Sequence, residues 1–202
     1  MGSIFEVGRV SPWAAKTIIL LASIVMVAIR APHGRRRSRI AAISSRRGTL
    51  EIVLLTLAWL GFFLPLIWIA TPLLASADYP LRPIPLLAGT GCLALGLWLF
   101  HLSHAYLGAN WSITLEVLDN HSLVTQGVYR RVRHPMYTAL LLYSAGQALV
   151  LPNYVAGLSS AVAMALLVAL RIGPEERMMV EQFGANYRQY AAATKRLLPG
   201  IW

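Results

Sequence analysis

Two polar segments interrupt an apolar chain of 202 residues and hold most of the side chains that could do chemistry. One covers residues 121–137 and contains Tyr129. The other covers residues 171–190 and begins with Arg171. Both flank apolar runs, and ionisable groups at membrane depth are costly and usually functional. These two segments therefore predict the place where the protein acts.

The end of the first segment, residues 133–137 (Arg-His-Pro-Met-Tyr), brings a guanidinium, an imidazole and a phenol to the start of an expected helix. Pro135 suits the first helical position, where its missing N–H costs no hydrogen bond. A structural alternative stays open for Arg133 and Tyr137, because a capped helix with a snorkelling arginine and an interfacial tyrosine is common at membrane boundaries.

The second segment favours the functional interpretation. Residues 173–176 (Gly-Pro-Glu-Glu) predict another helix start, with proline at the first position and acids favoured by the helix dipole. Arg171 precedes Glu175 by four residues, so the two side chains can meet across one turn. An arginine and a glutamate that face the same site as His134 suit a zwitterionic ligand with a carboxylate and an ammonium.

The composition predicts an all-α integral membrane protein. Hydrophobic residues make up 57% of the chain and charged residues only 13%, well below the roughly 25% of soluble domains. The net charge of +10 does not indicate nucleic-acid binding, because the arginines cluster beside apolar runs without interleaved aromatics. Cys92 is the only cysteine, which excludes an intrachain disulfide and argues against a thiol catalyst.

Apolar runs predict five transmembrane helices, because a bilayer core of about 30 Å requires roughly 20 apolar residues. A signal peptide is the alternative for the first run, but the positive charges follow that run instead of preceding it. The last two runs are joined so tightly that they predict a helical hairpin. The five runs are residues 13–29, 52–74, 86–106, 137–151 and 154–172.

Arginine and lysine set the expected orientation. The loop between the first two spans, the segment 107–136 and the tail hold every Lys and Arg except Arg9, Lys16, Arg82 and Arg171, which lies at the tail end of the fifth run. That side should be cytoplasmic, with the N-terminus outside and the C-terminus in the cytosol. Both polar segments then face the cytosol together, as they must if they form one site.

Other kinds of site are disfavoured. His101 and His104 are spaced to share one side of a helix, but no third metal ligand with suitable spacing follows, so we expect no metal site. The glycines at 89, 91 and 96 predict close helix packing instead of ligand binding. No glycine-rich dinucleotide fingerprint or phosphate loop is present in the sequence.

Several spaced motifs of the C-terminal half belong to one recognisable signature. They are residues 123–129 (Leu-Val-Thr-Gln-Gly-Val-Tyr), residues 133–137, Glu175-Glu176, Phe183-Gly184, Tyr187, Tyr190, Arg196 and Pro199. This set resembles the C-terminal signature of isoprenylcysteine carboxyl methyltransferases (ICMT) and related membrane phospholipid methyltransferases. The resemblance covers roughly residues 111–202.

The resemblance implies a membrane enzyme that binds S-adenosylmethionine from the cytosol and admits a lipid-like methyl acceptor from the bilayer. Residues 1–106 would form three transmembrane helices with a basic cytosolic loop, and residues 107–202 the methyltransferase core with the cytosolic cofactor-binding region. Arg171 and Glu175 would be catalytic, and Arg171 and Arg133 would bind the acceptor. The cofactor would contact His121, Ser122, Leu123, Val124, Tyr129, His134, Pro135, Met136, Tyr137, Glu175 and Glu176.

Methyl transfer from a sulfonium cancels charge, so positioning and desolvation supply most of the catalysis. A carboxylate or thiolate acceptor needs no general base, whereas an ammonium acceptor must first lose a proton, which Glu175, Glu176 or His134 could take. The expected acceptor is a prenylated cysteine carboxylate, with phospholipid amines and small thiols as alternatives. A non-catalytic membrane protein that binds lipid headgroups is the rival class.

Overall fold

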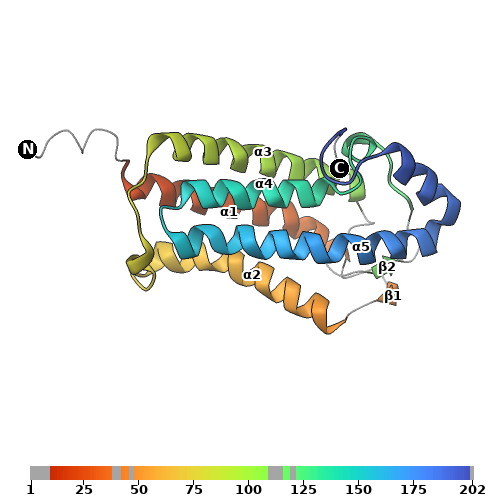
Figure 1. Cartoon of the computed structure of the whole chain (residues 1–202), viewed down its shortest axis with the longest axis horizontal. Helices are drawn as coiled ribbons and strands as arrows, with labels where there is room; N and C mark the ends of the chain where they lie inside the picture. Colours follow the sequence, from red (N-terminus) through yellow and green to blue (C-terminus); the bar gives the residue numbers. More distant parts are fainter. Residues whose placement is uncertain (1–9, 38–41, 46–47, 109–115, 119–121, 201–202) are drawn as a thin grey trace, which may run out of the picture.

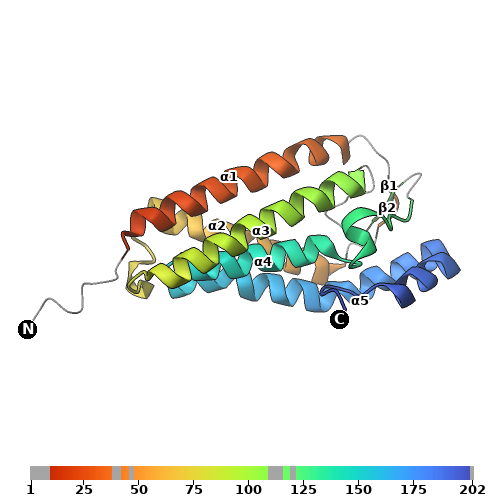
Figure 2. The same ribbon diagram turned by 90° about the horizontal axis from the view of Figure 1, so that it is seen from above.

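The computed structural model describes residues 10–37, 42–45, 48–108, 116–118 and 122–200. Five helices run roughly along one axis and form an elongated bundle (Figures 1 and 2). Helix α4 packs between α3 and α5, α1 packs on α3, and α2 packs on α5. The helices are α1 (Pro12–Arg37), α2 (Thr49–Ala70), α3 (Pro83–Leu107), α4 (Pro135–Val150) and α5 (Tyr154–Ala193).

Four of these helices, α1, α2, α3 and α5, are long and apolar enough to cross a membrane. Each of the five expected runs forms a helix, but α4 has only 16 residues, fewer than the roughly 20 that a full span requires. The chain is therefore a multi-pass membrane protein with one shorter helix enclosed between α3 and α5. Residues 151–153 alone connect α4 to α5, which confirms the predicted hairpin.

Close packing between α3 and α4 depends on two of the three glycines in α3. A Cβ at Gly89 would lie 2.8 Å from the carbonyl oxygen of Gly146, and one at Gly96 would lie 2.9 Å from the backbone nitrogen of Tyr143. A Cβ at Gly91 would meet nothing within 4 Å. The expected role in helix packing is thus confirmed for Gly89 and Gly96 and is wrong for Gly91, which is exposed.

Replacing Gly96 by alanine should lower the free energy of unfolding by roughly 1–3 kcal/mol, because the added methyl group overpacks the contact with α4. The matched control is Gly91→Ala, which should be neutral or slightly stabilising, because alanine favours a helix over glycine. Thermal unfolding in detergent measures both. Equal midpoints for the two variants would contradict the packing role of Gly96.

Helix α5 differs from the expectation. The sequence predicts a new helix start at residues 173–176, but α5 continues through Pro174 without a break, so that prediction is wrong. Glu176, two residues after Pro174, forms ion pairs with Arg133 and Arg196 from outside the helix. The backbone turns only at Gly184, whose φ of 54° is strained for any residue with a side chain.

The turn at Gly184 directs the last part of α5 back over the end of the bundle (Figure 1). At the same end lie two short antiparallel strands, β1 (Ala42–Ser45) and β2 (Glu116–Leu118). The all-helical prediction holds for the bundle, and this strand pair is an addition to it. The strands join the loop between α1 and α2 to the segment after α3, because backbone groups outside helices need partners.

Candidate active site

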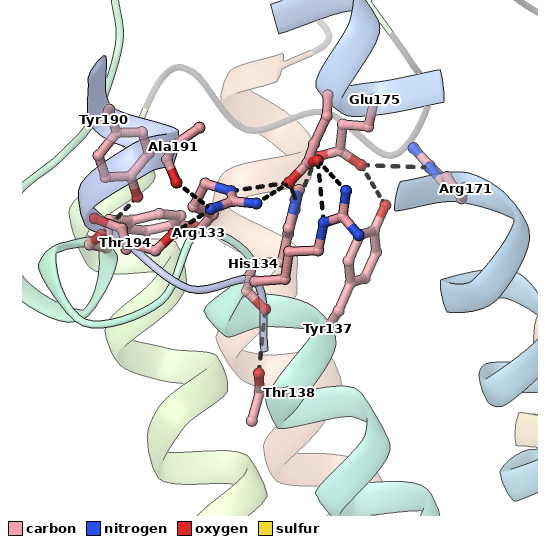
Figure 3. A network of polar contacts seen from close by, with 12 residues as sticks. Arg133, His134, Tyr137, Thr138, Arg171, Glu175, Tyr190, Ala191 and Thr194 are labelled. Carbon is pink, nitrogen blue, oxygen red and sulfur yellow. Dashed lines mark hydrogen bonds and ion pairs between the residues drawn. The ribbon is translucent and has the colours of Figure 1, made fainter. Parts of the chain in front are cut away.

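The two polar segments of the sequence meet where α4 begins (Figure 3). Pro135 is the first residue of α4, as the sequence predicts, and His134 is its N-cap. Glu176, from the middle of α5, connects the segments. Its Oε1 accepts hydrogen bonds from Arg133 Nε at 2.9 Å and from His134 Nε2 at 3.3 Å, and its Oε2 accepts one from Arg196 Nη2 at 2.9 Å.

The chain after α5 completes this cluster. The backbone nitrogens of Arg133 and His134 donate to the carbonyl oxygens of Lys195 and Arg196, at 2.8 and 3.0 Å. The Arg133 guanidinium also donates to the carbonyls of Ala191 and Thr194 at the end of α5. Lysine and arginine side chains commonly satisfy the last carbonyls of a helix. The start of α4 is thereby tied to the C-terminal segment.

Replacing Glu176 by alanine should lower the free energy of unfolding by roughly 3 kcal/mol, because it removes the carboxylate that pairs with the buried guanidinium of Arg133. The more exposed Arg196 loses the same partner. Thermal unfolding in detergent measures the loss. Glu181→Ala, which removes an exposed carboxylate from the same helix, is the control and should shift the midpoint little. A shift no larger than that of the control would refute the supporting role of Glu176.

Glu175, the neighbour of Glu176, faces a different set of partners. Tyr137 donates a hydrogen bond of 2.5 Å to Glu175 Oε2, and His134 Nδ1 lies 3.7 Å from Oε1. Arg171 Nε lies 4.0 Å from Oε2 on the same helix, which confirms the predicted contact across one turn. The Glu175 side chain keeps 28% of its surface exposed. A carboxylate in this position can accept a hydrogen bond from a further cationic group.

An elongated cavity of about 270 Å³ opens beside Glu175. Before the turn at Gly184, its lining follows α5 from Ser160 to Met179, a rise of about 28 Å at about 1.5 Å per residue. Tyr187 and Tyr190 line the cavity from the part of α5 after the turn. The end near Glu175 is polar and aromatic. The other end is apolar and includes Leu140, Met164 and Leu167. Such a cavity can hold a polar ligand at one end and an apolar chain at the other.

The cavity unites most of the residues that the sequence singled out. Glu176 is not in its lining, and His121 lies outside the described residues. The catalytic candidates Arg171 and Glu175 both face the cavity, as does Arg133. The expected cofactor-binding residues in the lining are Ser122, Leu123, Val124, Tyr129, His134, Pro135, Met136, Tyr137 and Glu175.

Sequence reasoning missed the contribution of the first two helices. Arg30 of α1 and Trp59 of α2 line the cavity, and the Arg30 guanidinium lies 5.5 Å from the centre of the Trp59 ring. The sequence indicates only weakly that these residues belong to the site, since Arg30 reads as part of the basic cytosolic loop between the first two spans. Met178 and Met179 also line the cavity and carry no signal, because methionine in an apolar chain indicates packing.

Tyr129 adds no charge to the cavity. Burial of its ring, followed by the negative charge of Glu175, raises the pKa of the phenol well above its usual value of 10. The hydroxyl therefore stays protonated at any physiological pH. The backbone around Tyr129 is held by Tyr190, whose hydroxyl donates to the Tyr129 carbonyl at 2.6 Å.

Within the described residues, no three His, Cys, Asp or Glu side chains gather as a metal site.

Comparison with known proteins shows what this part of the chain is similar to. Residues 89–181 match the sequence model of the isoprenylcysteine carboxyl methyltransferase (ICMT) family. The resemblance inferred from the motifs is thereby confirmed over this region. The ICMT-family match starts earlier than expected, within α3, and ends before Phe183 and Gly184, so the last motifs of the signature lie outside it.

Curated relatives of the ICMT family agree with this match. The chain is 37% identical over 89 residues to protein-S-isoprenylcysteine O-methyltransferase A of Arabidopsis thaliana, covering 44% of this chain and 45% of that one. It is 33% identical over 113 residues to the Schizosaccharomyces pombe protein-S-isoprenylcysteine O-methyltransferase, covering 55% and 48%. The human protein-S-isoprenylcysteine O-methyltransferase is 33% identical over 96 residues, covering 46% and 34%. The chain thus spans about half the length, or less, of these relatives.

A solved ICMT-family structure shows a related fold. The eukaryotic intramembrane Ras methyltransferase ICMT superposes with a TM-score of 0.53 and 25% sequence identity, covering 77% of this chain and 54% of that one. The covered share of this chain exceeds the 93 residues of the family match, so the similarity in fold reaches beyond residues 89–181.

Proposed function

We propose that this protein is a membrane methyltransferase that uses S-adenosylmethionine to methylate a lipid-like acceptor. The observation that carries the proposal is a cavity that joins a polar end, at Glu175 and Tyr137, to an apolar end between the helices. The ICMT-family match over residues 89–181 supports the same activity. Protein-S-isoprenylcysteine O-methylation, the activity named for the relatives, is the reaction that we assign first.

The polar end of the cavity fits the cofactor by the chemistry of its side chains. Glu175 supplies a partly exposed carboxylate for an ammonium group, and Tyr137 and His134 hold that carboxylate in place. Leu123, Val124 and the other apolar residues of the lining supply an apolar surface against which the planar adenine ring of the cofactor could pack. When bound, the cofactor supplies an electrophilic methyl group. Glu176 has its oxygens occupied by Arg133, His134 and Arg196, so we assign it a supporting role.

The apolar end fits a flexible chain. Five of the six methionines in the sequence, all except Met1, line the cavity, and Met164 lies at its apolar end. Methionine is unbranched and polarisable and adapts to irregular partners. Val27 and Trp59 line the cavity and are also exposed on the outside of α1 and α2. We therefore propose that the acceptor enters from the bilayer between these two helices.

The residues between the two ends suit an anionic acceptor. Arg171 faces the cavity from α5, and its guanidinium can orient a carboxylate towards the methyl group. A carboxylate acceptor needs no general base. An ammonium acceptor would first have to lose a proton, which Glu175 could take. Phospholipid amines and small thiols stay as alternative acceptors.

We extend the proposal to topology. The ends of α1 and α3 and the starts of α2 and α4 lie at the same end of the bundle as the site (Figure 1). The arginine bias assigns this end to the cytoplasm, with α4 as a fifth, short span, the N-terminus outside and the C-terminus in the cytosol. We propose that residues 1–106 form three N-terminal transmembrane helices with a basic cytosolic loop. Residues 107–202 would form the methyltransferase core, with the cytosolic cofactor segment, the transmembrane hairpin and an amphipathic C-terminal tail.

Calorimetric titration of S-adenosylhomocysteine into the purified protein tests the proposal, followed by methyl transfer assays. Three acceptors separate the alternatives: N-acetyl-S-farnesylcysteine, phosphatidylethanolamine vesicles and an alkyl thiol. Binding together with transfer to the farnesylcysteine is the expected result. Absence of binding by a folded protein would favour the rival class, a non-catalytic protein that binds lipid headgroups.

A further inference from the structure

The first turn of α2 carries an acid that the sequence motifs do not include. Glu51 is the third residue of α2, and its side chain keeps only 8% of its surface exposed. It lies outside residues 89–181, the part of the chain that matches the ICMT family. A carboxylate in the first turn of a helix is favoured by the dipole, but burial of a charge still requires a charged partner.

Arg171 is such a partner. Its Nη2 lies 3.5 Å from Glu51 Oε1, and its side chain is 9% exposed. On the other side, its Nε lies 4.0 Å from Glu175 Oε2. The guanidinium is therefore held between a carboxylate of α2 and a carboxylate of α5. Arg171 lines the cavity and Glu51 does not, so the ion pair with Arg171 connects Glu51 to the cavity.

We propose that Glu51 is a positioning residue of the acceptor site, which holds the Arg171 guanidinium in the orientation that receives the anionic group of the acceptor. Arginine has a long, flexible side chain, and a fixed partner lowers the entropy lost when it orients a ligand. The inference rests on the proposed methyltransferase activity. It also gives the N-terminal helices a direct part in the site.

The experiment compares Glu51→Gln with the wild type on the acceptor that the wild type methylates fastest. The carboxamide keeps the size of the side chain and removes its charge, so kcat should fall roughly tenfold to hundredfold through misplacement of Arg171. Titration of S-adenosylhomocysteine should still show binding, because the variant leaves Glu175 and Tyr137 in place. The exposed Glu181→Gln is the matched control and should leave kcat unchanged.

A double-mutant cycle with Arg171→Ala separates positioning from general stability. If Glu51 acts through Arg171, Glu51→Gln should cause no further loss of kcat in the Arg171→Ala background. Additive losses, or a Glu51→Gln variant as fast as the wild type, would overturn the proposal. If Glu51→Gln does not fold, Glu51→Asp keeps the charge and serves in the same cycle, with a smaller expected loss.

The outcomes for the wild type are distinct from those for the variants. A wild type that does not bind S-adenosylhomocysteine refutes the methyltransferase proposal itself. A wild type that binds it but methylates none of the three acceptors overturns the acceptor site on which the role of Glu51 depends. Only a wild type that turns over while Glu51→Gln matches it refutes the positioning role alone.

Discussion

Replacing Arg171 by alanine should lower kcat for an anionic acceptor by roughly 10²–10³-fold, the range found when one preorganised charged or hydrogen-bonding group is removed from an active site. The arginine lines the cavity between the cofactor end and the apolar end, and the carboxylates of Glu51 and Glu175 flank it. Loss of the guanidinium leaves the acceptor free to adopt unproductive orientations. Methyl transfer to N-acetyl-S-farnesylcysteine, measured with saturating cofactor, gives kcat directly.

Two further measurements test this role of Arg171. Arg177→Ala removes an exposed guanidinium from the same helix, outside the cavity lining, and should leave kcat within about twofold of the wild type. Arg171→Ala should also affect S-adenosylhomocysteine binding far less than turnover. Equal loss of binding and turnover would assign Arg171 to the cofactor instead of the acceptor.

Replacing Glu175 by alanine should weaken S-adenosylhomocysteine binding by roughly 10–100-fold, because a charge-assisted hydrogen bond contributes about 1.5–3 kcal/mol. The variant also removes the acceptor for the Tyr137 hydroxyl, which is 2.5 Å away, and leaves that buried donor without its partner. Calorimetric titration of wild type and variant gives the ratio of dissociation constants.

Glu181→Ala is the control for Glu175→Ala, because it makes the same chemical change on an exposed part of α5. It should bind S-adenosylhomocysteine as the wild type does. Wild-type affinity in Glu175→Ala would exclude this carboxylate from the cofactor site. The thermal midpoint must be measured alongside, since loss of fold would also abolish binding.

The neighbouring acids Glu175 and Glu176 show how far sequence can separate roles. Both follow Arg171 within one or two turns, and both were expected to contact the cofactor. In the structure, Glu175 lines the cavity, whereas Glu176 is not among the lining residues. The Glu176 carboxylate instead accepts hydrogen bonds from Arg133, His134 and Arg196. Adjacent residues on a helix point about 100° apart, so one can face a ligand while the next faces the protein. The two roles can be assigned only from the tertiary structure, in which Arg196 of the C-terminal segment pairs with Glu176 and not with Glu175.

Local sequence determined the features that depend on neighbouring residues. Apolar runs of sufficient length predicted all five helices, because the bilayer requires such runs. Pro135 predicted the start of α4, and the spacing of Arg171 and Glu175 predicted their contact, because both follow from helix geometry. The motifs around His134 were enough to indicate the ICMT family.

The tertiary structure decided what depends on distant partners. Pro174 reads as a helix start, yet α5 passes through it, because packing at the end of the bundle outweighs one lost hydrogen bond. The contributions of Arg30, Glu51 and Trp59 come from helices that carry no motif, and these residues reach the site because α1 packs on α3 and α2 packs on α5. The ion pair of Glu51 with Arg171 joins residues more than 100 positions apart, and no local sequence pattern predicts such a contact.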